Sequence, residues 1–333
     1  AMLSHGNMVA NVLQANEWIE SSFLAGRGTL ITALPLYHIF GLTANCLLFL
    51  RLGWRNILIV NPRDFGAFVR ELKRYPFQFI TGVNTLFNAL LNTAGFAAVD
   101  FSALRVTLGG GMAVQESVAK RWKKVTGVIL TQAWGLTETA PAACINIPSV
   151  DFNGSIGLPI SSTEISIRDD SGVALGVGQS GEICVRGPQV MVGYWNRPDE
   201  TAKVMLAGGW LKTGDIGRFD TAGYVYLEDR KKDMILVSGF NVYPNEVENV
   251  VAAHPGVLEV AAIAQPDERS GEVVALFIVR KDPSLTEADV IAYCRESLTG
   301  YKVPKHVYFR DQLPKSNVGK ILRRALRDQL PKH

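Results

Sequence analysis

One stretch indicates the fold most directly: Val128-Ile129-Leu130-Thr131-Gln132-Ala133-Trp134-Gly135-Leu136-Thr137-Glu138-Thr139. Residues 128–131 form an apolar run typical of a buried strand, and Val114–Lys124 before it has the spacing of an amphipathic helix. Helices that alternate with buried strands predict an α/β fold, in which helices cover both faces of a parallel sheet. We therefore expect residues 132–139 to form a loop at the carboxyl end of a parallel strand, where open sheets bind ligands.

The same alternation runs through the residues before this stretch. Strands are predicted at Leu30–Leu34, Ile57–Val60, Phe77–Ile80 and Val106–Leu108, and helices at Gly41–Leu50, Phe65–Arg74 and Thr85–Asn92. Ser4 is placed to cap a further helix, from about Gly6 to Ser21. Residues 1–150 are therefore predicted to be the α/β part of a large domain.

The pattern changes near Pro148, and residues 151–229 are predicted to contain strands without helices. Strand-like alternation is found at Ile165–Arg168, Gly181–Arg186 and Tyr224–Leu227, and turns are expected at 169–172 and 220–223. Short strands that follow one another without helices favour antiparallel pairing. This part is therefore predicted to be an antiparallel, β-barrel-like subdomain of the large domain.

Residues 230–333 are predicted to form a small α+β domain, with the charged run Arg230–Asp233 as its linker. One helix is expected to begin at Pro244, because proline favours the first helical position, and another after Thr286, which can cap it. Strands are expected at Val260–Ala264, Val273–Val279 and Val307–Arg310.

Charge and cysteine content argue against several classes of protein. The 333 residues carry 34 Lys and Arg against 31 Asp and Glu, and this formal charge of +3 gives no support to nucleic-acid binding. Cys46, Cys144, Cys184 and Cys294 lie far apart in apolar runs, as expected of buried free thiols in a reducing compartment. No signal peptide is apparent, and the most apolar stretch, 46–60, is too short to span a bilayer. A cytoplasmic location is therefore expected.

Three side chains in the expected loop suit a bound nucleotide. Trp134 offers a flat face for a purine, Thr137 a hydroxyl for a phosphate oxygen, and Glu138 a ligand for a Mg²⁺ ion that bridges phosphates. The rival interpretation is structural: Thr137 and the nearby Glu138 would cap a helix beneath a buried Trp134. Spacing alone favours the structural interpretation.

Further candidates lie at turns elsewhere in the chain. Gly109-Gly110-Gly111 follows a predicted strand and lets the backbone approach a ligand closely. Asp215 can accept hydrogen bonds from ribose hydroxyls, and Arg230 can donate to the same sugar. Lys320 follows a glycine and can reach an anionic centre as a point charge. Each also has a structural alternative (a tight turn, a turn carboxylate, a solvated basic run), which is favoured when the residue is taken alone.

Taken together and in order, these segments resemble the adenylate-forming superfamily of acyl-CoA synthetases, adenylation domains and luciferases. The resemblance covers essentially the whole chain and is strongest to bacterial long-chain fatty-acid–CoA ligases. The segments that carry it are Leu34–Gly41, Gly135–Thr139, Gly187–Met191, Asp229–Pro244 and Lys315–Lys320.

The resemblance implies a two-step reaction with ATP, Mg²⁺ and coenzyme A. A fatty acid carboxylate attacks the α-phosphate of ATP to give an acyl-adenylate and pyrophosphate, and the thiolate of coenzyme A then displaces AMP. Both steps suit cationic and metal stabilisation of phosphate charge.

The resemblance also assigns roles to individual residues. Trp134 would stack on adenine, Thr137 would contact the α-phosphate, Glu138 would bind Mg²⁺, and Asp215 and Arg230 would hold the ribose, with Gly110, Gly111 and Gly135 also at the nucleotide. Lys320 would bridge the acyl carboxylate and the phosphate during adenylation, Lys232 would be the hinge of the mobile small domain, Ser238 and Gly239 would line the coenzyme A channel, and His38 and Gly109 would lie at the acyl pocket. A structural histidine is an equally weighted interpretation of His38.

One family feature is absent from this sequence. In the superfamily, a Ser/Thr/Gly-rich phosphate loop ending in Pro-Lys-Gly immediately precedes the segment that matches Ala1–His5. We therefore expect the chain alone to adenylate poorly, because the β- and γ-phosphates lack their cradle. The missing sheet half also predicts exposed apolar surface and a tendency to self-associate.

Other functions remain as alternatives. An enzyme that activates amino acids would need a carboxylate in the acyl pocket, and there is no Asp or Glu around Tyr37–Phe40. An enzyme that activates aryl acids shares the chemistry and differs in pocket shape. A non-catalytic nucleotide-binding protein has no need to keep both Glu138 and Lys320. Homo-oligomerisation and peripheral membrane association are left open, as is the preferred acyl chain length.

Overall fold

The computed structural model describes residues 1–20 and 28–330, which fall into two compact units. The first unit comprises Ala1–Val114, Val118–Thr213 and Gly217–Leu227, and the second comprises Gln115–Ser117, Gly214–Ile216 and the chain from Glu228 onward. Ser21, the expected end of the first helix, lies outside the described residues.

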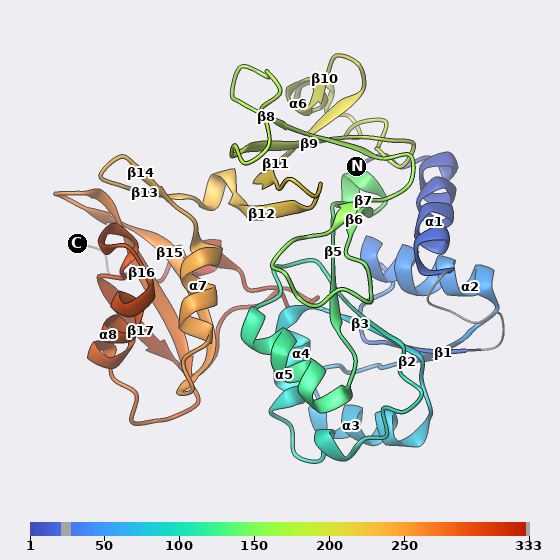
Figure 1. Cartoon of the computed structure of the whole chain (residues 1–333), viewed down its shortest axis with the longest axis horizontal. Coiled ribbons are helices and arrows are strands. Elements are labelled where there is room, and N and C mark those ends of the chain that lie inside the picture. The colour runs from blue at the N-terminus through green and yellow to red at the C-terminus, as the bar shows by residue number, and fades with distance from the viewer. Residues whose placement is uncertain (21–27, 331–333) are drawn as a thin grey trace. The chain divides into compact units, whose positions relative to one another are not determined.

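In the described part of the chain, the first unit contains a seven-stranded sheet with the order β2-β1-β3-β4-β5-β6-β7 (Figure 1). Its strands are β1 (Thr29–Thr32), β2 (Arg55–Leu58), β3 (Phe79–Gly82), β4 (Val106–Gly109), β5 (Leu130–Gly135), β6 (Ala142–Ile145) and β7 (Leu158–Pro159). Neighbouring strands from β2 to β5 pair in parallel, whereas β6 and β7 are antiparallel additions. The predicted parallel sheet is confirmed.

Helices pack on this sheet through large buried side chains. They are α1 (His5–Glu20), the π-helix η1 (Gly41–Leu47), α2 (Leu48–Leu52), α3 (Phe65–Arg74), α4 (Asn84–Leu91), the 3₁₀ turn η2 (Phe96–Ala98) and α5 (Glu116–Thr126). On α5, Trp122 is fully buried, meets Phe87 of α4 edge-on at 4.8 Å between ring centroids, and donates to Thr107 of β4 at 3.0 Å. This burial gives the helices their fixed places on the sheet.

The segment predicted as an ordinary helix from Gly41 to Leu50 begins as a π-helix. Within it, the fully buried Asn45 donates to the hydroxyls of Thr32 (2.9 Å) and Thr81 (2.7 Å) on two adjacent strands. The prediction used a hydrophobic period of 3.6 residues. That signal does not predict a π-helix, nor a buried amide on the helix face that meets the sheet.

The loop predicted to begin at Gln132 was placed too early. Strand β5 continues to Gly135, because Ala133 and Trp134 pair with Ile145 and Cys144 of the antiparallel strand β6. The true turn is the short 3₁₀ segment η3 (Thr137–Thr139). The residues of the motif are therefore divided between a strand and the turn that follows it.

A second sheet of the described residues has five strands in the order β10-β11-β9-β8, with β12 paired to β11. Its strands are β8 (Glu164–Arg168), β9 (Gly181–Arg186), β10 (Met205–Leu206), β11 (Trp210–Phe219) and β12 (Val225–Arg230). The prediction of strands without helices was wrong at α6 (Pro198–Val204). Pro198 at the helix start and the acidic Asp199 and Glu200 in the first turn favour that helix.

In the second unit, a five-stranded sheet of described residues has the order β14-β13-β16-β15, with β17 paired to β16. Its elements are the 3₁₀ turn η4 (Lys231–Asp233), β13 (Ile235–Val237), β14 (Phe240–Val242), α7 (Pro244–Ala252), β15 (Val257–Asp267), β16 (Gly271–Arg280), α8 (Glu287–Ser297), η5 (Gly300–Lys302), β17 (His306–Arg310) and α9 (Arg323–Arg327). Both predicted helix starts are confirmed: Pro244 opens α7, and the Thr286 hydroxyl accepts from the amide of Asp289 to cap α8.

All four cysteines are free, and three of them are buried. Burial raises the pKa of the Cys184 and Cys294 thiols to about 11, so they behave as small apolar side chains. Of the helices in the described part of the chain, none is both long and apolar enough to cross a membrane.

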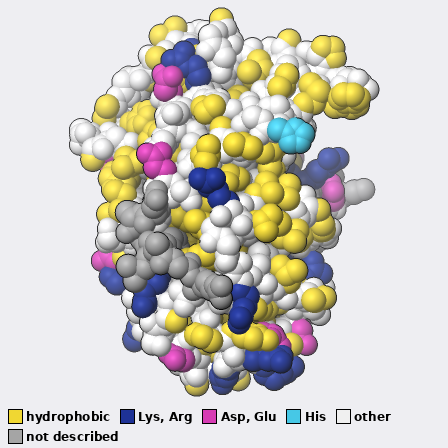
Figure 2. All heavy atoms as spheres, turned by 90° about the vertical axis from the view of Figure 1, so that its right-hand side faces the viewer, with side chains coloured by type: hydrophobic (Ala, Val, Ile, Leu, Met, Phe, Trp, Pro, Cys, Tyr) yellow, Lys and Arg dark blue, Asp and Glu magenta, His cyan; other side chains and the backbone are white. Residues whose placement is uncertain are grey.

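Several apolar side chains of the first unit are exposed on α1, on α2 and around the end of β2. The exposed fractions are 56% for Val9 and 44% for Leu13 on α1, and 74% for Leu50 on α2, with Leu58 and Val60 exposed at and after the end of β2. Figure 2, which faces the side carrying α1 and α2, shows hydrophobic side chains gathered there. The expectation of exposed apolar surface agrees with this set of five residues, which we call the apolar face.

Candidate functional site

The candidate residues are divided between the two units. Gly109–Gly111, residues 134–138 and His38 belong to the first unit. Asp215, Arg230, Lys232, Ser238, Gly239 and Lys320 belong to the second. Each unit therefore carries a separate part of the predicted chemistry.

The glycine run ends β4 and is tightly packed. A Cβ on Gly110 would lie 3.1 Å from the Ala133 carbonyl oxygen and 3.1 Å from the ring of Phe40, and Gly111 has a φ of +76°. Packing at Gly110 and the backbone conformation at Gly111 therefore favour glycine. A role at the nucleotide or, for Gly109, at the acyl pocket stays a prediction.

Gly135 and Trp134 are also held by packing. A Cβ on Gly135 would overlap the carbonyl oxygen of Pro141, so no side chain fits there. Trp134 is only 7% exposed and belongs to the core between β5 and the second sheet, with Ile167 and Val185 among its cluster. This burial matches the structural interpretation of the tryptophan, and stacking on adenine stays a prediction.

Thr137 and Glu138 project from η3, which immediately follows the strand. Thr137 is exposed and Glu138 is half-buried. The hydroxyl of Tyr194 donates to Oε1 of Glu138 at 2.8 Å, and the backbone N–H of Met191 donates to the Glu138 carbonyl at 2.8 Å. Burial, followed by the hydrogen bond to Glu138, raises the pKa of Tyr194 to about 12, so the phenol remains a donor. The Glu138 carboxylate is thus oriented by a residue that the sequence did not single out.

His38 lies at the turn before the π-helix. Its Nδ1 accepts from the backbone N–H of Phe40 at 3.2 Å, and the backbone N–H of His38 donates to the Pro35 carbonyl at 3.0 Å. The half-buried imidazole therefore helps to form the turn, which supports the structural interpretation without testing the acyl-pocket one.

Asp215 and Arg230 are brought together on the neighbouring strands β11 and β12. The Nε of Arg230 lies 3.4 Å from Oδ1 of Asp215, whose side chain is 5% exposed, whereas Arg230 is 41% exposed. A buried carboxylate beside a partly exposed guanidinium offers one acceptor and one donor to a diol. This is the pair of groups that the sequence assigned to a ribose.

Lys320 sits at the end of a closed turn in the second unit. The Ser316 N–H donates to the Lys320 carbonyl at 2.8 Å, the Gly319 N–H donates to the Ser316 carbonyl at 2.9 Å, and Gly319 has a φ of +83°. Burial, with a further contribution from the nearby Arg230 charge, lowers the pKa of Lys320 to about 8. The ammonium is therefore poorly solvated, which strengthens its interaction with an anion.

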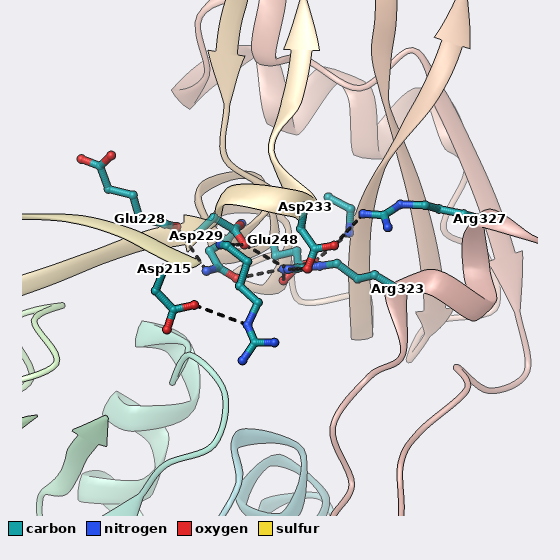
Figure 3. Close-up of polar contacts among 10 residues, drawn as sticks. Asp215, Glu228, Asp229, Asp233, Glu248, Arg323 and Arg327 are labelled. Carbon is teal, nitrogen blue, oxygen red and sulfur yellow. Dashed lines mark hydrogen bonds and ion pairs between the residues drawn. The ribbon is translucent and has the colours of Figure 1, made fainter. Parts of the chain in front are cut away.

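Beside this turn lies a partly buried ionic group that the sequence did not indicate (Figure 3). The guanidinium of Arg323 donates to Asp229 at 3.1 Å and to both Glu248 oxygens at 2.9 Å, and lies 3.7 Å from Asp233. Arg327 donates to Asp233 at 2.6 Å. We call these five residues the Arg323 cluster. The partners of Arg323 are 94 and 75 residues away in sequence, so no local pattern could have predicted it.

Two acidic members of the Arg323 cluster, Glu248 and Asp233, have shifted pKa values. Burial raises the pKa of Glu248 although Arg323 opposes the shift. Burial also opposes ionisation of Asp233, but Arg327 and Arg323 outweigh it and lower its pKa. Each charge in the cluster is therefore stabilised mainly by the opposite charges beside it, because water reaches these side chains poorly.

The remaining candidates lie at turns of the second unit. Lys232 is exposed within η4, between Asp229 and Asp233 of the Arg323 cluster. Ser238 and Gly239 form the turn between β13 and β14, with φ values of +50° and +86°, and both are exposed. Their assignment to a hinge and to a coenzyme A channel stays a prediction.

Comparison with known proteins accounts for this combination of elements. Residues 1–195 match the family described as AMP-binding enzyme, and residues 246–320 match the AMP-binding enzyme C-terminal domain. The chain belongs to the AMP-binding enzyme family. Its two matched regions carry, respectively, the Thr137–Glu138 turn and Lys320.

Relatives of the AMP-binding enzyme family align along nearly the whole chain. A long-chain-fatty-acid–CoA ligase of Escherichia coli O157:H7 is 58% identical over 330 residues, covering 99% of this chain and 59% of the relative. A long-chain-fatty-acid–CoA ligase of Haemophilus influenzae is 54% identical, and the alignment covers 100% of this chain and 60% of that relative. The crystal structure of ATP-bound MatB from Rhodopseudomonas palustris has a TM-score of 0.90 at 31% identity, covering 99% of this chain and 65% of that one. The chain thus spans about three-fifths of the length of these relatives.

The donor set fits a Mg²⁺ ion that is shared with a nucleotide. Among the described residues, no group of three or more His, Cys, Asp or Glu side chains could hold a metal by itself. A single oriented carboxylate such as Glu138 is the protein contribution expected when Mg²⁺ takes its other ligands from phosphates and water.

Proposed function

We propose that this chain serves an ATP-dependent ligase that joins a long-chain fatty acid to coenzyme A through an acyl-adenylate. The observation that carries the proposal is the 58% identity to a long-chain-fatty-acid–CoA ligase across 99% of the chain. The pair of the buried Asp215 with the partly exposed Arg230 and the desolvated Lys320 ammonium supply groups that such chemistry requires. The proposed reactants are the fatty acid, ATP and coenzyme A, and the proposed location is the cytoplasm.

In adenylation, the fatty acid carboxylate attacks the α-phosphorus and pyrophosphate leaves. Lys320 pairs with the carboxylate and the phosphate, so that negative charge in the transition state is met by a poorly hydrated cation. The Thr137 hydroxyl donates to an α-phosphate oxygen. Glu138 would hold Mg²⁺, which supplies neutralisation of phosphate charge when bound.

Asp215 and Arg230 orient the nucleotide rather than take part in bond making. Carboxylate oxygens of Asp215 accept from the ribose hydroxyls, and the partly exposed Arg230 adds a donor to the same sugar. Coenzyme A then approaches along Ser238 and Gly239, which form an exposed turn. Its thiolate forms the thioester bond as AMP leaves.

An uncharged acyl tail is favoured over an amino acid. Residues 36–40, before the π-helix, contain no Asp or Glu that could pair with an ammonium group. An aryl acid is the second candidate, because its activation uses the same chemistry and requires only a different shape of the acyl pocket.

Binding of an acyl-adenylate analogue tests the proposal on the chain itself. A non-hydrolysable long-alkyl acyl-sulfamoyl adenosine is titrated calorimetrically into the wild type, into Asp215→Asn, and into the exposed control Asp311→Asn. We expect binding that Asp215→Asn weakens by roughly tenfold or more, as the loss of a charged hydrogen bond does. The control should bind as the wild type does. Absence of binding, or equal binding by Asp215→Asn, would refute the proposal.

Lys320→Ala tests the chemical step. In a protein that carries this chain together with the phosphate loop, pyrophosphate release from ATP in the presence of palmitate should fall to background in Lys320→Ala. Lys281→Ala, at an exposed position of the same unit, should leave it unchanged. An aryl acid that is turned over faster than palmitate would favour the second candidate instead.

A further inference from the structure

The turn that carries Lys320 is anchored by an ion pair at each end. Before the turn, Nζ of Lys315 lies 2.7 Å from Oε2 of Glu259 on β15. After the turn, Arg323 enters the Arg323 cluster. Backbone pairing of Lys315 with Ile321 closes the turn between these anchors. The position of Lys320 therefore depends on where Arg323 is held.

Arg323 is held from three separate segments at once. Asp229 lies at the end of β12, Asp233 in η4, and Glu248 in the middle of α7. Their side chains are 1%, 12% and 15% exposed, and that of Arg323 is 16% exposed. A planar guanidinium can serve several acceptors in one fixed orientation, which an ammonium cannot do.

Two of these acceptors stand on opposite sides of Lys232 in the chain. The same nitrogen, Nη1 of Arg323, lies 3.1 Å from Asp229 and 3.7 Å from Asp233. Asp229 also accepts from the backbone N–H of Asn245 at the start of α7, at 2.8 Å. A change of backbone angles at Lys232 would therefore move Asp229 and Asp233 apart and loosen the grip on Arg323.

We propose that Arg323 is a positioning residue for Lys320. It links the turn that carries Lys320 to Asp229 and Asp233, which lie on either side of Lys232 in the chain. Arg323 touches none of the reacting groups, and it acts by fixing where the lysine is presented. The inference rests on the function proposed for Lys320 above. It adds that the lysine is placed correctly only while Asp229 and Asp233 share one guanidinium.

Local amide exchange in the chain tests this placement without requiring catalysis. The variants are Arg323→Gln, Arg323→Lys and, as the matched control, Arg324→Gln at the exposed neighbouring position. In Arg323→Gln we expect residues 314–322 and 229–233 to exchange about tenfold faster or more, the change expected when a charged hydrogen bond is lost. Strands β15 and β16 and the Arg324→Gln control should keep their wild-type exchange.

Reactivity of Lys320 provides a readout that a purely structural role would not move. Competitive amine labelling at a series of pH values reports the pKa of Lys320, which lies at about 8 in the wild type. In Arg323→Gln this pKa should rise, because a neighbouring cation is lost and the lysine becomes better hydrated. Arg323→Lys should also fail to restore the wild-type exchange and labelling, since a lysine ammonium lacks the planar, bidentate geometry with which Arg323 meets both Glu248 oxygens.

Several results would overturn the proposal. Unchanged exchange of residues 314–322 in Arg323→Gln would do so, as would acceleration spread equally over β15 and β16, which indicates general destabilisation. Full rescue by Arg323→Lys would show that charge alone suffices. If Lys320→Ala retains pyrophosphate release, the proposed function fails instead, independently of the exchange and labelling results.

Discussion

At the scale of single residues, Lys320 is unlike an ordinary surface lysine because its ammonium is half-buried next to other charges. Burial and Arg230 lower its pKa, while the carboxylates of Asp215 and Asp233 counteract part of the shift. Keeping a half-buried lysine charged costs free energy, because the ammonium is poorly hydrated. An anion that binds beside it reduces this cost, so the anion binds more strongly than it would to a fully hydrated lysine. The lowered pKa of Lys320 also makes the stability of the fold depend on pH.

The free energy of unfolding should rise with pH between the folded and the unfolded pKa values of Lys320. Its folded pKa is about 8, below the value of roughly 10.4 for an unfolded lysine. Between these values the unfolded chain binds more protons, so stability increases with pH, and below about pH 8 this contribution is constant. Urea unfolding should show this rise in the wild type and in Lys281→Met but not in Lys320→Met. Parallel curves for the wild type and Lys320→Met would contradict it.

Tyr194 provides a second prediction at this scale. Tyr194→Phe removes the donor to Glu138 and should lower the free energy of unfolding by about 1 kcal/mol, the usual worth of one hydrogen bond. Tyr37→Phe is the control, because Tyr37 is 75% exposed. Denaturant titration measures both, and equal stability of the two variants would show that the Glu138 contact contributes nothing.

At the scale of elements, local signals predicted the helices of the second unit well. Pro244 and Thr286 act at the helix starts themselves, so a sequence pattern is sufficient to find them. The end of β5 was missed because its last residues are held by pairing with β6 rather than by their own propensity. Helix α6 was missed because a short helix between strands has little periodicity, although Pro198 was a usable signal.

The same contrast applies to the candidate site. Asp215, Arg230 and Lys320 were candidates because of their side-chain chemistry, but each alone favoured a structural interpretation, and only the family resemblance gave them a functional one. The Arg323 cluster and the Tyr194–Glu138 contact could not be named, because their members meet only through tertiary packing across 94 and 56 residues. Sequence reveals groups that perform chemistry more readily than groups that hold them.

The cap of α8 gives a prediction for an element. The Thr286 hydroxyl accepts from the Asp289 N–H at 3.2 Å, and the Asp289 carboxylate accepts from the Thr286 N–H at 3.0 Å. Thr286→Ala should lower the free energy of unfolding of the second unit by about 1 kcal/mol, whereas Thr286→Ser should retain most of it. Chemical unfolding followed by helical circular dichroism measures the difference. A Thr286→Ser variant as unstable as Thr286→Ala would refute the capping role.

At the scale of the whole molecule, the apolar face of the first unit stands out against a nearly balanced surface charge. Val9 and Leu13 on α1 and Leu50 on α2 expose side chains that usually pack against other protein. The formal charge of +3 gives little electrostatic repulsion between copies. Both properties favour association.

We therefore expect concentration-dependent self-association that charge on this face suppresses. Sedimentation velocity should show larger species for the wild type as concentration rises, and the double variant Leu13→Lys with Leu50→Lys should remain monomeric. Val173→Lys adds charge at an exposed apolar residue after β8 and should still associate. A wild type that stays monomeric throughout would contradict the expectation.

The crowding of Gly135 against the Pro141 carbonyl affects how sequence tolerance in this motif is interpreted. In a saturation library selected only for folded protein, position 135 should already accept no residue but glycine. The exposed Thr137, by contrast, should vary freely until the library is selected for turnover. A comparison of the two selections would separate positions that the backbone dictates from positions that the nucleotide dictates, although both lie within one short motif.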